Sequence, residues 1–394
     1  MGSEPGMAWN WCVNLAKYCE LFIITEEEFR DKIEAVVPTL PQGENMHFYF
    51  NPVTPEVRRM CWNQGDWRFY WHYRQWQKQT LEIAKQICAE QKIDIIHQLN
   101  MICFREPGLL WKIKGPKFVW GPVGGMETMP IDYLKDAGLK SQLFNIIKNT
   151  INTLQYKLQP NFHRAISRTD ALIAATRGCQ EILGQYYKGE VPLINETGCY
   201  PQEQISKTKQ NKNQFNVLWC GKFDFRKRLD IAIKTIAKLK EQDIKLHVAG
   251  TGDIDKYRSL AQECGVEDRV IFYGQVNHEE INSLMQQADL FLFTSIMDAT
   301  STVVMEAIQN RLPVVCFDTC GFGTVVDETI GVKIPLSNPV QSVNDFADAI
   351  RSLYYDQEKL KKLSDNCKER IKLFEWDYKA KMMMEIYKGC INEK

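Results

Sequence analysis

The second half of the chain alternates short apolar runs with longer stretches in which apolar residues recur every three or four positions. Short continuous apolar runs are typical of strands buried on both faces of a parallel sheet, and the periodic stretches are typical of amphipathic helices. The predicted strands are residues 216–220, 244–249, 270–273, 290–294 and 313–317. This alternation predicts a doubly wound α/β domain with right-handed crossovers.

The first half of the chain shows the same alternation less regularly. Its predicted strands are residues 21–25, 93–99, 118–121 and 171–176, and its longest predicted helices cover residues 67–91 and much of 140–168. Residues 202–214 are polar and contain several lysines, which is typical of a linker. We therefore predict two domains, an N-terminal one over residues 1–200 and a C-terminal one over residues 215–375.

The beginning of the chain departs from this pattern. Residues 1–6 run directly into a helical pattern, with no apolar run before them. Because a doubly wound domain normally starts with a strand, we expect the first strand of the N-terminal domain to be missing or to lie further upstream.

Composition narrows the class of protein. A chain of 394 residues exceeds what one hydrophobic core usually supports, in agreement with two domains. The 49 basic and 49 acidic residues balance, which argues against a protein that binds nucleic acid through its phosphates. The 13 cysteines are odd in number and form no C-x-x-C pair, so we expect reduced thiols in a cytoplasmic protein. Because no run of about 18 apolar residues occurs, any membrane contact would be peripheral.

Ligands of open α/β sheets bind at the carboxyl ends of the strands, so the segments that follow the predicted strands are the candidate site. In the C-terminal half these segments are residues 221–223, 250–252, 274–276, 295–302 and 318–323. Four of these five segments contain glycine, which allows a ligand to approach the backbone closely. We expect the five segments to share one rim.

Lys222 and Lys227 follow the first of these strands with the spacing K-x4-K. Two ammonium groups there would neutralise a diphosphate, each charged hydrogen bond contributing about 1.5–3 kcal/mol. Because Arg226 and Arg228 lie in the same loop, a solvated basic loop explains the pattern equally well.

Residues 298–306 form the most informative stretch. Thr300 or Ser301 suits the N-cap of a helix that begins near Ser301, and free N–H groups at this start would bind phosphate or sugar hydroxyls. Glu306 lies about one turn further along, where its carboxylate would accept hydrogen bonds from two vicinal ribose hydroxyls. The alternative is a capped helix whose Glu306 is only half-buried.

Two weaker motifs favour structural interpretations. Asp253 and Asp255 match the D-x-D pattern of some metal sites, but they open a predicted helix, where capping and the helix dipole explain them more simply. Gly250 and Gly252 begin a dinucleotide-binding G-x-G-x-x-G that Asp255 interrupts. We expect neither a metal nor a cofactor.

Residues 218–327 resemble the donor-binding domain of glycosyltransferase family 4, whose members are retaining enzymes of GT-B architecture. The resemblance rests on the order and spacing of Gly221-Lys222-Phe223 with Lys227, Gly250-Thr251-Gly252, Asp298-x7-Glu306 and Pro313-Val314-Val315. It implies two Rossmann-like domains that face each other across a cleft. It also implies that residues 376–394 form a C-terminal helix that returns to the N-terminal domain.

The resemblance implies a role for each site residue. Lys222 and Lys227 would hold the donor diphosphate without a metal, Glu306 would bind the ribose and Asp298 the sugar ring. The other donor-binding residues would be Gly221, Gly250, Gly252, Gln275, Val276, Thr300, Ser301 and Thr302. The acceptor would enter beside Gly2, Ser3, Glu4, His97, Gly124 and Gly125. Catalysis would then consist mainly of positioning and electrostatic stabilisation.

The sequence departs from the family's pattern at three places. Asp298 replaces a glutamate and is one methylene shorter. Lys222 replaces an arginine, which loses the planar fork that grips phosphate. Residues 299–301 replace a glycine–phenylalanine–glycine triplet, which changes how closely the backbone can approach the sugar.

We therefore predict a retaining glycosyltransferase of bacterial surface polysaccharide synthesis that uses a nucleotide sugar and a glycan or lipid-linked acceptor. We place it in the cytoplasm or peripherally on the cytoplasmic face of the inner membrane. Residues 140–168 mix apolar and basic side chains, which suits either a surface facing anionic lipid or an ordinary domain helix. Two alternative functions are a nucleotide-sugar 2-epimerase of the same architecture and a catalytically silent sugar-nucleotide-binding subunit.

Overall fold

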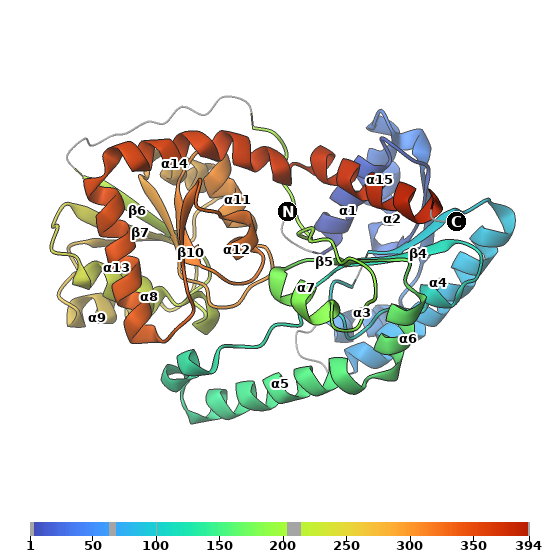
Figure 1. The fold of residues 1–394 in the computed structure, drawn as a ribbon, viewed down its shortest axis with the longest axis horizontal. Coiled ribbons are helices and arrows are strands. Elements are labelled where there is room, and N and C mark those ends of the chain that lie inside the picture. Colours follow the sequence, from blue (N-terminus) through green and yellow to red (C-terminus); the bar gives the residue numbers. More distant parts are fainter. Residues whose placement is uncertain (1–3, 63–67, 100, 203–213, 393–394) are drawn as a thin grey trace.

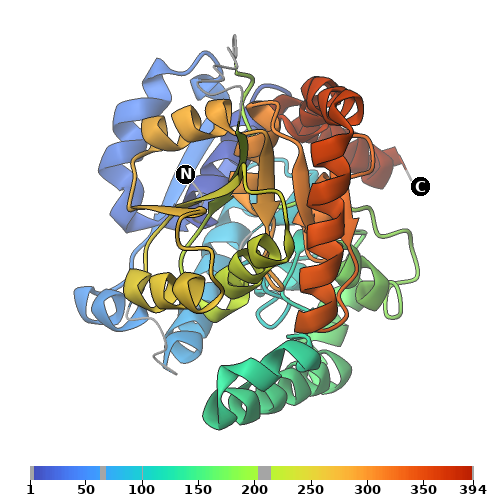
Figure 2. The same ribbon diagram turned by 90° about the vertical axis from the view of Figure 1, so that its left-hand side faces the viewer.

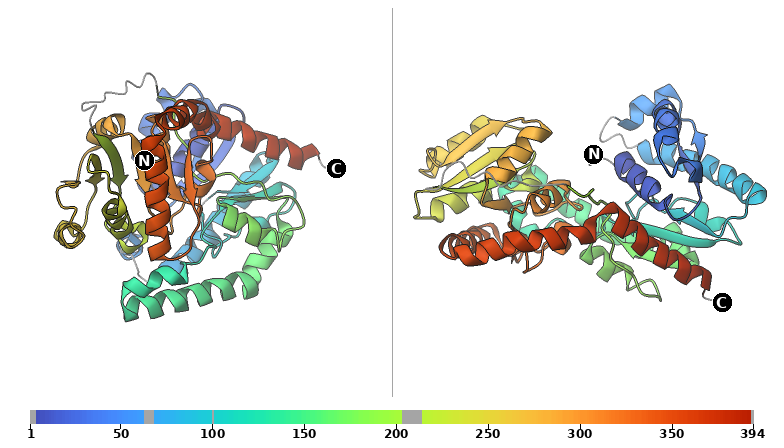
Figure 3. Two further views of the ribbon diagram at one scale, coloured as in Figure 1. Left: turned by 60° about the vertical axis from the view of Figure 1, so that its left-hand side comes forward. Right: turned by 90° about the horizontal axis from the view of Figure 1, so that it is seen from above.

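The computed structural model describes residues 4–62, 68–99, 101–202 and 214–392, which form two α/β halves lying side by side (Figure 1). The N-terminal half contains the strands up to β5, and the C-terminal half contains those from β6 onward. The last helix leaves the C-terminal half and ends against the N-terminal half, as the view from above shows (Figure 3).

A six-stranded parallel sheet forms the centre of the C-terminal half. In sheet order its strands are β11 (Gly331–Ile334), β10 (Val314–Phe317), β9 (Leu290–Phe293), β6 (Phe215–Cys220), β7 (Ile244–Ala249) and β8 (Val270–Gly274). The five predicted strands are confirmed to within one residue at each end. β11 was not predicted, because a glycine and Lys333 break up its short apolar run.

Helices connect these strands and cover the sheet. They are α8 (Leu229–Lys238), α9 (Ile254–Glu263), α10 (His278–Gln287), α11 (Thr302–Gln309), α12 (Phe322–Val325), α13 (Pro339–Tyr355) and α14 (Gln357–Arg370). Every residue of β9 and of β10 is buried, as expected of central strands covered on both faces. The apolar periodicity of residues 228–240 corresponds to α8, in which Ile231, Ile233 and Ile236 are buried.

The strands of the N-terminal half lie in two parallel sheets. β1 (Leu21–Glu26) pairs with β2 (Met46–Asn51), and β3 (Ile95–Gln98), β4 (Lys117–Val123) and β5 (Ala171–Ala174) form the second sheet. The four predicted strands are confirmed. β2 was not predicted, because His47 and Asn51 leave only the three-residue apolar run 48–50 in it. Within the described residues α1 (Glu4–Leu15) is the first element and β1 follows it.

The remaining N-terminal helices are α2 (Arg30–Val36), α3 (Pro55–Trp62), α4 (Phe69–Glu90), α5 (Leu139–Leu158), α6 (Pro160–Arg168) and α7 (Arg177–Leu183). The single helix predicted within residues 140–168 is wrong in one respect, since it is divided into α5 and α6. The division falls at Pro160, which occupies the first turn of α6 and has no N–H to continue α5. The long helix predicted over residues 67–91 is α4.

Two segments join the halves. The last helix, α15 (Trp376–Asn392), packs against α1, where Trp376 and Trp11 meet edge to face at 5.6 Å between ring centroids. In the other direction, the 3₁₀ segment Ile131–Ala137 reaches into the C-terminal core. There Tyr133 is fully buried, and its hydroxyl lies 2.6 Å from the Oγ of Ser342. Each half therefore contributes an element to the core of the other.

Two sequence expectations concern the whole chain. No disulfide joins the described cysteines. In the described part of the chain, no helix has both the length and the apolar character needed to cross a bilayer.

Candidate functional site

The carboxyl ends of β6, β7 and β8 surround a pocket of about 270 Å³. Five of the predicted site residues line it: Gly221, Lys222, Gly250, Gln275 and Val276. A larger surface hollow of about 460 Å³ lies between α9 and β8, but none of the predicted site residues lines it. The structure therefore brings the first three rim segments together around one pocket.

Gly250 allows the strand ends at this pocket to approach each other. Its φ is +155°, and a Cβ built on it would lie 1.8 Å from the carbonyl oxygen of Gly221. The N–H of Gly250 donates to the carbonyl of Gly274 at 2.8 Å, which ties β7 to β8. Gly252 is also constrained, because a Cβ there would lie 2.4 Å from the Cβ of Phe223. Glycine at these two positions is therefore required by packing around the pocket.

The two predicted lysines lie beside each other but in different environments. Lys222 is exposed and lines the pocket, whereas the side chain of Lys227 is only 14% exposed. Lys227 runs alongside Gly221, since a Cβ built on that glycine would lie 3.8 Å from the Lys227 Cδ. The Nζ of Lys227 lies 2.5 Å from an Asp298 carboxylate oxygen and 4.8 Å from the centroid of the Phe293 ring. Lys227 is thus a held cation at the edge of the pocket.

The loop that carries the lysines is shaped by its own side chains. Asp224 accepts hydrogen bonds from the N–H groups of Arg226 and Lys227, which fixes the turn. Arg228 is buried in a left-handed conformation, and it donates to the Asp230 carboxylate and to the carbonyl of Tyr133. Arg228 therefore has a structural role, and a uniformly solvated basic loop does not describe this segment.

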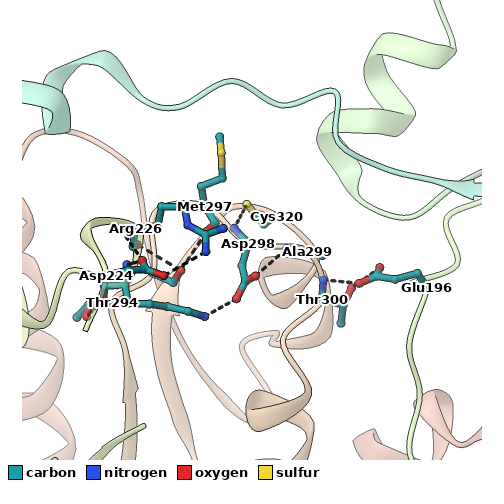
Figure 4. A network of polar contacts seen from close by, with 11 residues as sticks. Glu196, Asp224, Arg226, Thr294, Met297, Asp298, Ala299, Thr300 and Cys320 are labelled. Carbon is teal, nitrogen blue, oxygen red and sulfur yellow. Dashed lines mark hydrogen bonds and ion pairs between the residues drawn. The ribbon is translucent and has the colours of Figure 1, made fainter. Parts of the chain in front are cut away.

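Asp298 is held from two sides (Figure 4). One carboxylate oxygen accepts from Lys227, and the other accepts from the N–H of Ala299 at 3.0 Å. The N–H of Asp298 itself donates to the Sγ of Cys320 at 3.4 Å. Asp298 and Lys227 thus form a part-buried ion pair next to the pocket, with side-chain exposures of 24% and 14%.

At the start of α11, some backbone N–H groups already donate a hydrogen bond within the protein and others do not. Thr300 is buried, and its N–H and hydroxyl donate to the two carboxylate oxygens of Glu196 at 2.6 and 2.9 Å (Figure 4). Ser301 is the N-cap and makes no side-chain cap, and Thr302 is the first helical residue. Within the described residues, the N–H groups of Ser301 and Thr302 donate no hydrogen bond. These two N–H groups are available to an anion, while that of Thr300 is not.

Glu306 lies one turn into α11, near the base of the rim. Burial raises the pKa of Glu306, and the charge of His278 at the start of α10 opposes this shift. The pKa of the Cys220 thiol is raised mainly by burial and in second place by the charge of Glu306. Because Cys220 lines the pocket, Glu306 lies close to the pocket wall. Among the described residues, no side chain or N–H donates to the Glu306 carboxylate. With respect to the described residues, it is therefore a half-buried carboxylate that can accept hydrogen bonds from a ligand.

The predicted acceptor residues lie in the N-terminal half. Gly2 and Ser3 are outside the described residues. Glu4 and Gly124 converge on one segment, because the backbone of Ile102 hydrogen-bonds to Glu4 and its carbonyl accepts the N–H of Gly124 at 2.8 Å. Gly125 follows with a φ of +77°.

His97 is the remaining predicted acceptor residue, and its ring is already engaged. Its Nε2 lies 2.6 Å from the carbonyl of Gly121, and its Nδ1 lies 2.6 Å from the hydroxyl of Tyr387 on α15. Burial lowers the pKa of His97 to about 4, so the ring is neutral. A neutral ring with both contacts donates from Nε2 to Gly121 and accepts from the tyrosine hydroxyl. Neither nitrogen is left for an acceptor molecule.

Sequence analysis did not identify Glu196, which links the two halves next to the rim. Besides Thr300, it lies near the buried Lys379 of α15, whose Nζ donates to the carbonyl of Asn195. Burial raises the pKa of Glu196 and lowers that of Lys379 to about 7. The only signal in the sequence is the polar triplet 195–197 directly after an apolar run. Nothing in its local pattern indicates a partner 104 residues away.

The structural interpretation of the D-x-D motif is confirmed. Asp253 is the N-cap of α9, and its side chain accepts the N–H of Lys256 at 3.1 Å. Asp255 is almost fully exposed and lies 3.8 Å from Arg258, one turn along the same helix.

Comparisons with known proteins connect this geometry to a family. Residues 201–370 match the family "Glycosyl transferases group 1". Over 246 residues the chain is 24% identical to a D-inositol 3-phosphate glycosyltransferase of Xylanimonas cellulosilytica, covering 57% of this chain and 58% of that one. Over 153 residues it is 31% identical to the lipopolysaccharide glucosyltransferase WaaG of Escherichia coli, covering 35% and 40%. The chain spans about half the length of the relatives that it matches.

Solved structures resemble the whole chain. The Anabaena protein HepE in complex with UDP has a TM-score of 0.60 at 14% identity, covering 99% of this chain and 98% of that one. WaaG, a glycosyltransferase involved in lipopolysaccharide biosynthesis, has a TM-score of 0.55 at 18% identity, covering 94% and 99%. These similarities show the fold, which is the two-domain GT-B architecture. The assignment to family 4 within this group stays a prediction.

Proposed function

We propose that this chain, in which residues 201–370 belong to the glycosyl transferases group 1, is a glycosyltransferase that takes its sugar from a nucleoside diphosphate donor. The observation that carries the proposal is the pocket at the ends of β6, β7 and β8. An exposed lysine lines it, a held lysine lies at its edge, and the half-buried carboxylate of Glu306 lies beside it with no donor from the described residues. These groups match a diphosphate and a ribose.

We place the donor as follows. The base lies near Gln275 and Val276, and the ribose hydroxyls donate to Glu306. The diphosphate lies between Lys222, Lys227 and the open N–H groups of Ser301 and Thr302. This placement uses the strand-end rim where open α/β sheets bind their ligands, and it is supported by the similarity to HepE, whose structure contains UDP.

We propose that transfer proceeds with retention and without a metal. The acceptor hydroxyl attacks the anomeric carbon from the face that the diphosphate leaves, the bond from that carbon to the phosphate oxygen breaks, and the hydroxyl proton passes to the leaving phosphate. Lys222 and Lys227 stabilise the charge that develops on this phosphate, which is the main electrostatic contribution of the protein. Asp298 holds the ammonium group of Lys227 in place before the donor arrives.

We propose a glycan or lipid-linked acceptor and a role in building bacterial surface polysaccharide. The support is the similarity to WaaG, a lipopolysaccharide glucosyltransferase. The acceptor enters from the N-terminal half, beside Glu4, Gly124 and Gly125.

A donor screen tests the proposal. The full chain is heated with UDP, GDP and ADP sugars in turn, because a ligand that binds the folded state raises the melting temperature by mass action. We expect one base to raise it, and the matching sugar to be transferred or slowly hydrolysed. No shift with any donor contradicts the proposal. A free epimer of the donor identifies a 2-epimerase, and binding without turnover identifies a silent binding subunit.

A further inference from the structure

Helix α5 has the reverse of the usual amphipathic arrangement. In most helices on the surface of a globular domain, the apolar face packs on the protein and the polar face meets water. Here the polar face packs on the protein and the apolar face is exposed. The helix lies at the rim of the molecule, along the lower edge in Figure 1 and again lowest in Figure 2.

Asparagines make the inward face of α5. The side chain of Asn149 donates to the carbonyl of Met129 at 2.8 Å and accepts the N–H of the same residue at 2.9 Å. Asn152 is buried, and its amide donates to the carbonyl of Met126 at 3.2 Å. The oxygen of Asn152 accepts from the guanidinium of Arg105. α5 is therefore anchored by polar contacts that fix which face it turns outward.

The outward face of α5 is a continuous apolar stripe. Its members recur at spacings of three and four residues, which places them on one side of the helix. They are Leu139 (84% exposed), Leu143 (60%), Ile147 (48%), Ile151 (48%), Leu154 (48%) and Leu158 (69%). Phe144, which is 65% exposed, widens the stripe at one edge. A stripe of this length and exposure on a helix of 20 residues is not explained by the fold of this chain.

The charges around the apolar stripe have one sign. Residues 139–168, which cover α5 and α6, contain five lysines and arginines and no aspartate or glutamate, in a chain whose total charges balance. The five are Lys140, Lys148, Lys157, Arg164 and Arg168, and all of them are exposed. On α5 and α6 all charged neighbours of the stripe are therefore cations, while Asp132 of the adjoining 3₁₀ segment lies 3.3 Å from Lys135. Such a stripe suits a surface that is apolar inside and anionic outside.

We propose that α5 docks on an anionic lipid bilayer, with its apolar stripe in the acyl-chain boundary and its cations among the phosphate headgroups. The helix then lies in the plane of the interface, which agrees with the absence, in the described part of the chain, of a helix fit to cross a bilayer. A second copy of this chain is a poorer occupant, since it would bring the same cations to the same stripe. This surface is independent of the proposed donor chemistry.

Vesicle flotation tests the proposal without any sugar donor. The full chain is mixed with vesicles of phosphatidylcholine alone, or of phosphatidylcholine with phosphatidylglycerol. We expect flotation with the anionic vesicles, and a weaker effect when salt screens the headgroups. Replacing Leu143, Ile147 and Leu154 together by glutamine should reduce the partition coefficient by about tenfold or more, because exposed apolar area drives insertion. Their exposure and the helix propensity of glutamine keep this variant folded.

Two controls separate the contributions. The variant Val340→Gln with Ile391→Gln removes exposed apolar side chains elsewhere and should float like the wild type. The variant Lys148→Gln with Lys157→Gln should lose affinity for anionic vesicles only. The proposal is overturned if the wild type floats with neither vesicle, or if the three-glutamine variant floats as well as the wild type. It is also overturned if light scattering shows a dimer that the three-glutamine variant abolishes while vesicles do not bind.

Discussion

At the residue scale, the environment of Glu306 sets its proposed role. The carboxylate is half-buried, lacks a donor among the described residues and borders the pocket through Cys220. The two hydroxyls of a ribose would donate hydrogen bonds to this carboxylate. A glutamine amide has only one acceptor oxygen and would accept fewer hydrogen bonds from the same hydroxyls.

We therefore expect Glu306→Gln to reduce donor turnover by at least about tenfold, while the melting temperature stays close to that of the wild type. Steady-state turnover and a thermal melt measure the two quantities. Glu263→Gln, at the exposed end of α9, is the matched control and should leave both unchanged. An unchanged rate in Glu306→Gln would remove this residue from the site.

Lys222 allows a second prediction at this scale. Because it is exposed and lines the pocket, its removal should weaken donor binding without affecting folding. A charged hydrogen bond contributes about 1.5–3 kcal/mol, so Lys222→Ala should raise the Kd for the donor about ten- to a hundredfold. Isothermal titration calorimetry measures the Kd. Lys240 lies before β7, at the opposite end of the sheet, so the control variant Lys240→Ala should bind the donor like the wild type. Equally weakened donor binding in both variants would indicate a general charge effect.

Among single residues, the sequence predicted those site residues that directly follow a predicted strand. Gly221, Lys222, Gly250 and Gln275 could be grouped beforehand because parallel strands bring their carboxyl ends together. Glu196 and Tyr133 could not, because each contacts a residue about a hundred or more positions away in the other half. Such contacts depend on how the two halves are docked, which no local pattern contains.

At the element scale, the contact between β3 and α15 depends on a neutral His97. Burial lowers the pKa of this ring to about 4, whereas an unfolded histidine has a pKa of about 6.5. The unfolded chain therefore binds a proton at higher pH than the folded chain does. The neutral ring contributes its full stability above pH 6.5, and this contribution is lost as the pH falls toward 4, to a total of at most about 3 kcal/mol.

We expect the wild type to lose more stability between pH 6.5 and 4 than His97→Gln does, as measured by urea unfolding across this range. His163→Gln is the control, because that histidine lies on α6, away from this contact, and should keep the wild-type slope. Tyr387→Phe removes the hydroxyl that reaches Nδ1 but keeps the burial, so it should lower stability while keeping the pH dependence. A slope in His97→Gln that equals the wild-type slope would contradict this role.

Elements with a strong local pattern were predictable, and those shaped by their surroundings were not. The five predicted strands of the C-terminal sheet are short runs rich in apolar residues, and all five were found, although Ile271 and Tyr273 of the edge strand β8 are exposed. β2 and β11 were missed because the polar residues His47 and Lys333 leave only short apolar runs in these two strands. The break between α5 and α6 could have been placed from Pro160 alone, since proline cannot continue a helix.

At the scale of the whole molecule, the two halves meet next to the rim through Glu196 and Thr300. Because both carboxylate oxygens of Glu196 accept from Thr300, docking of the halves and the start of α11 are coupled. We expect Glu196→Ala to lower the free energy of unfolding by about 1–3 kcal/mol, since it leaves the N–H of Thr300 without its acceptor and removes the negative charge near Lys379. Urea unfolding measures this loss. Glu358→Ala, in the first turn of α14, is the control, and an equal effect would show that the coupling is absent.

The central claim is that a nucleoside diphosphate occupies the pocket at the ends of β6, β7 and β8, with its ribose on Glu306. Calorimetric titration of the full chain with UDP, GDP and ADP identifies the base, and titration with the 2′,3′-dideoxy form of the same diphosphate probes the ribose contact. We expect the dideoxy form to bind the wild type about tenfold more weakly than the ribose form, and this difference to be smaller in Glu306→Gln. Failure of all three diphosphates to bind, or equal binding of the two forms by the wild type, would contradict the claim.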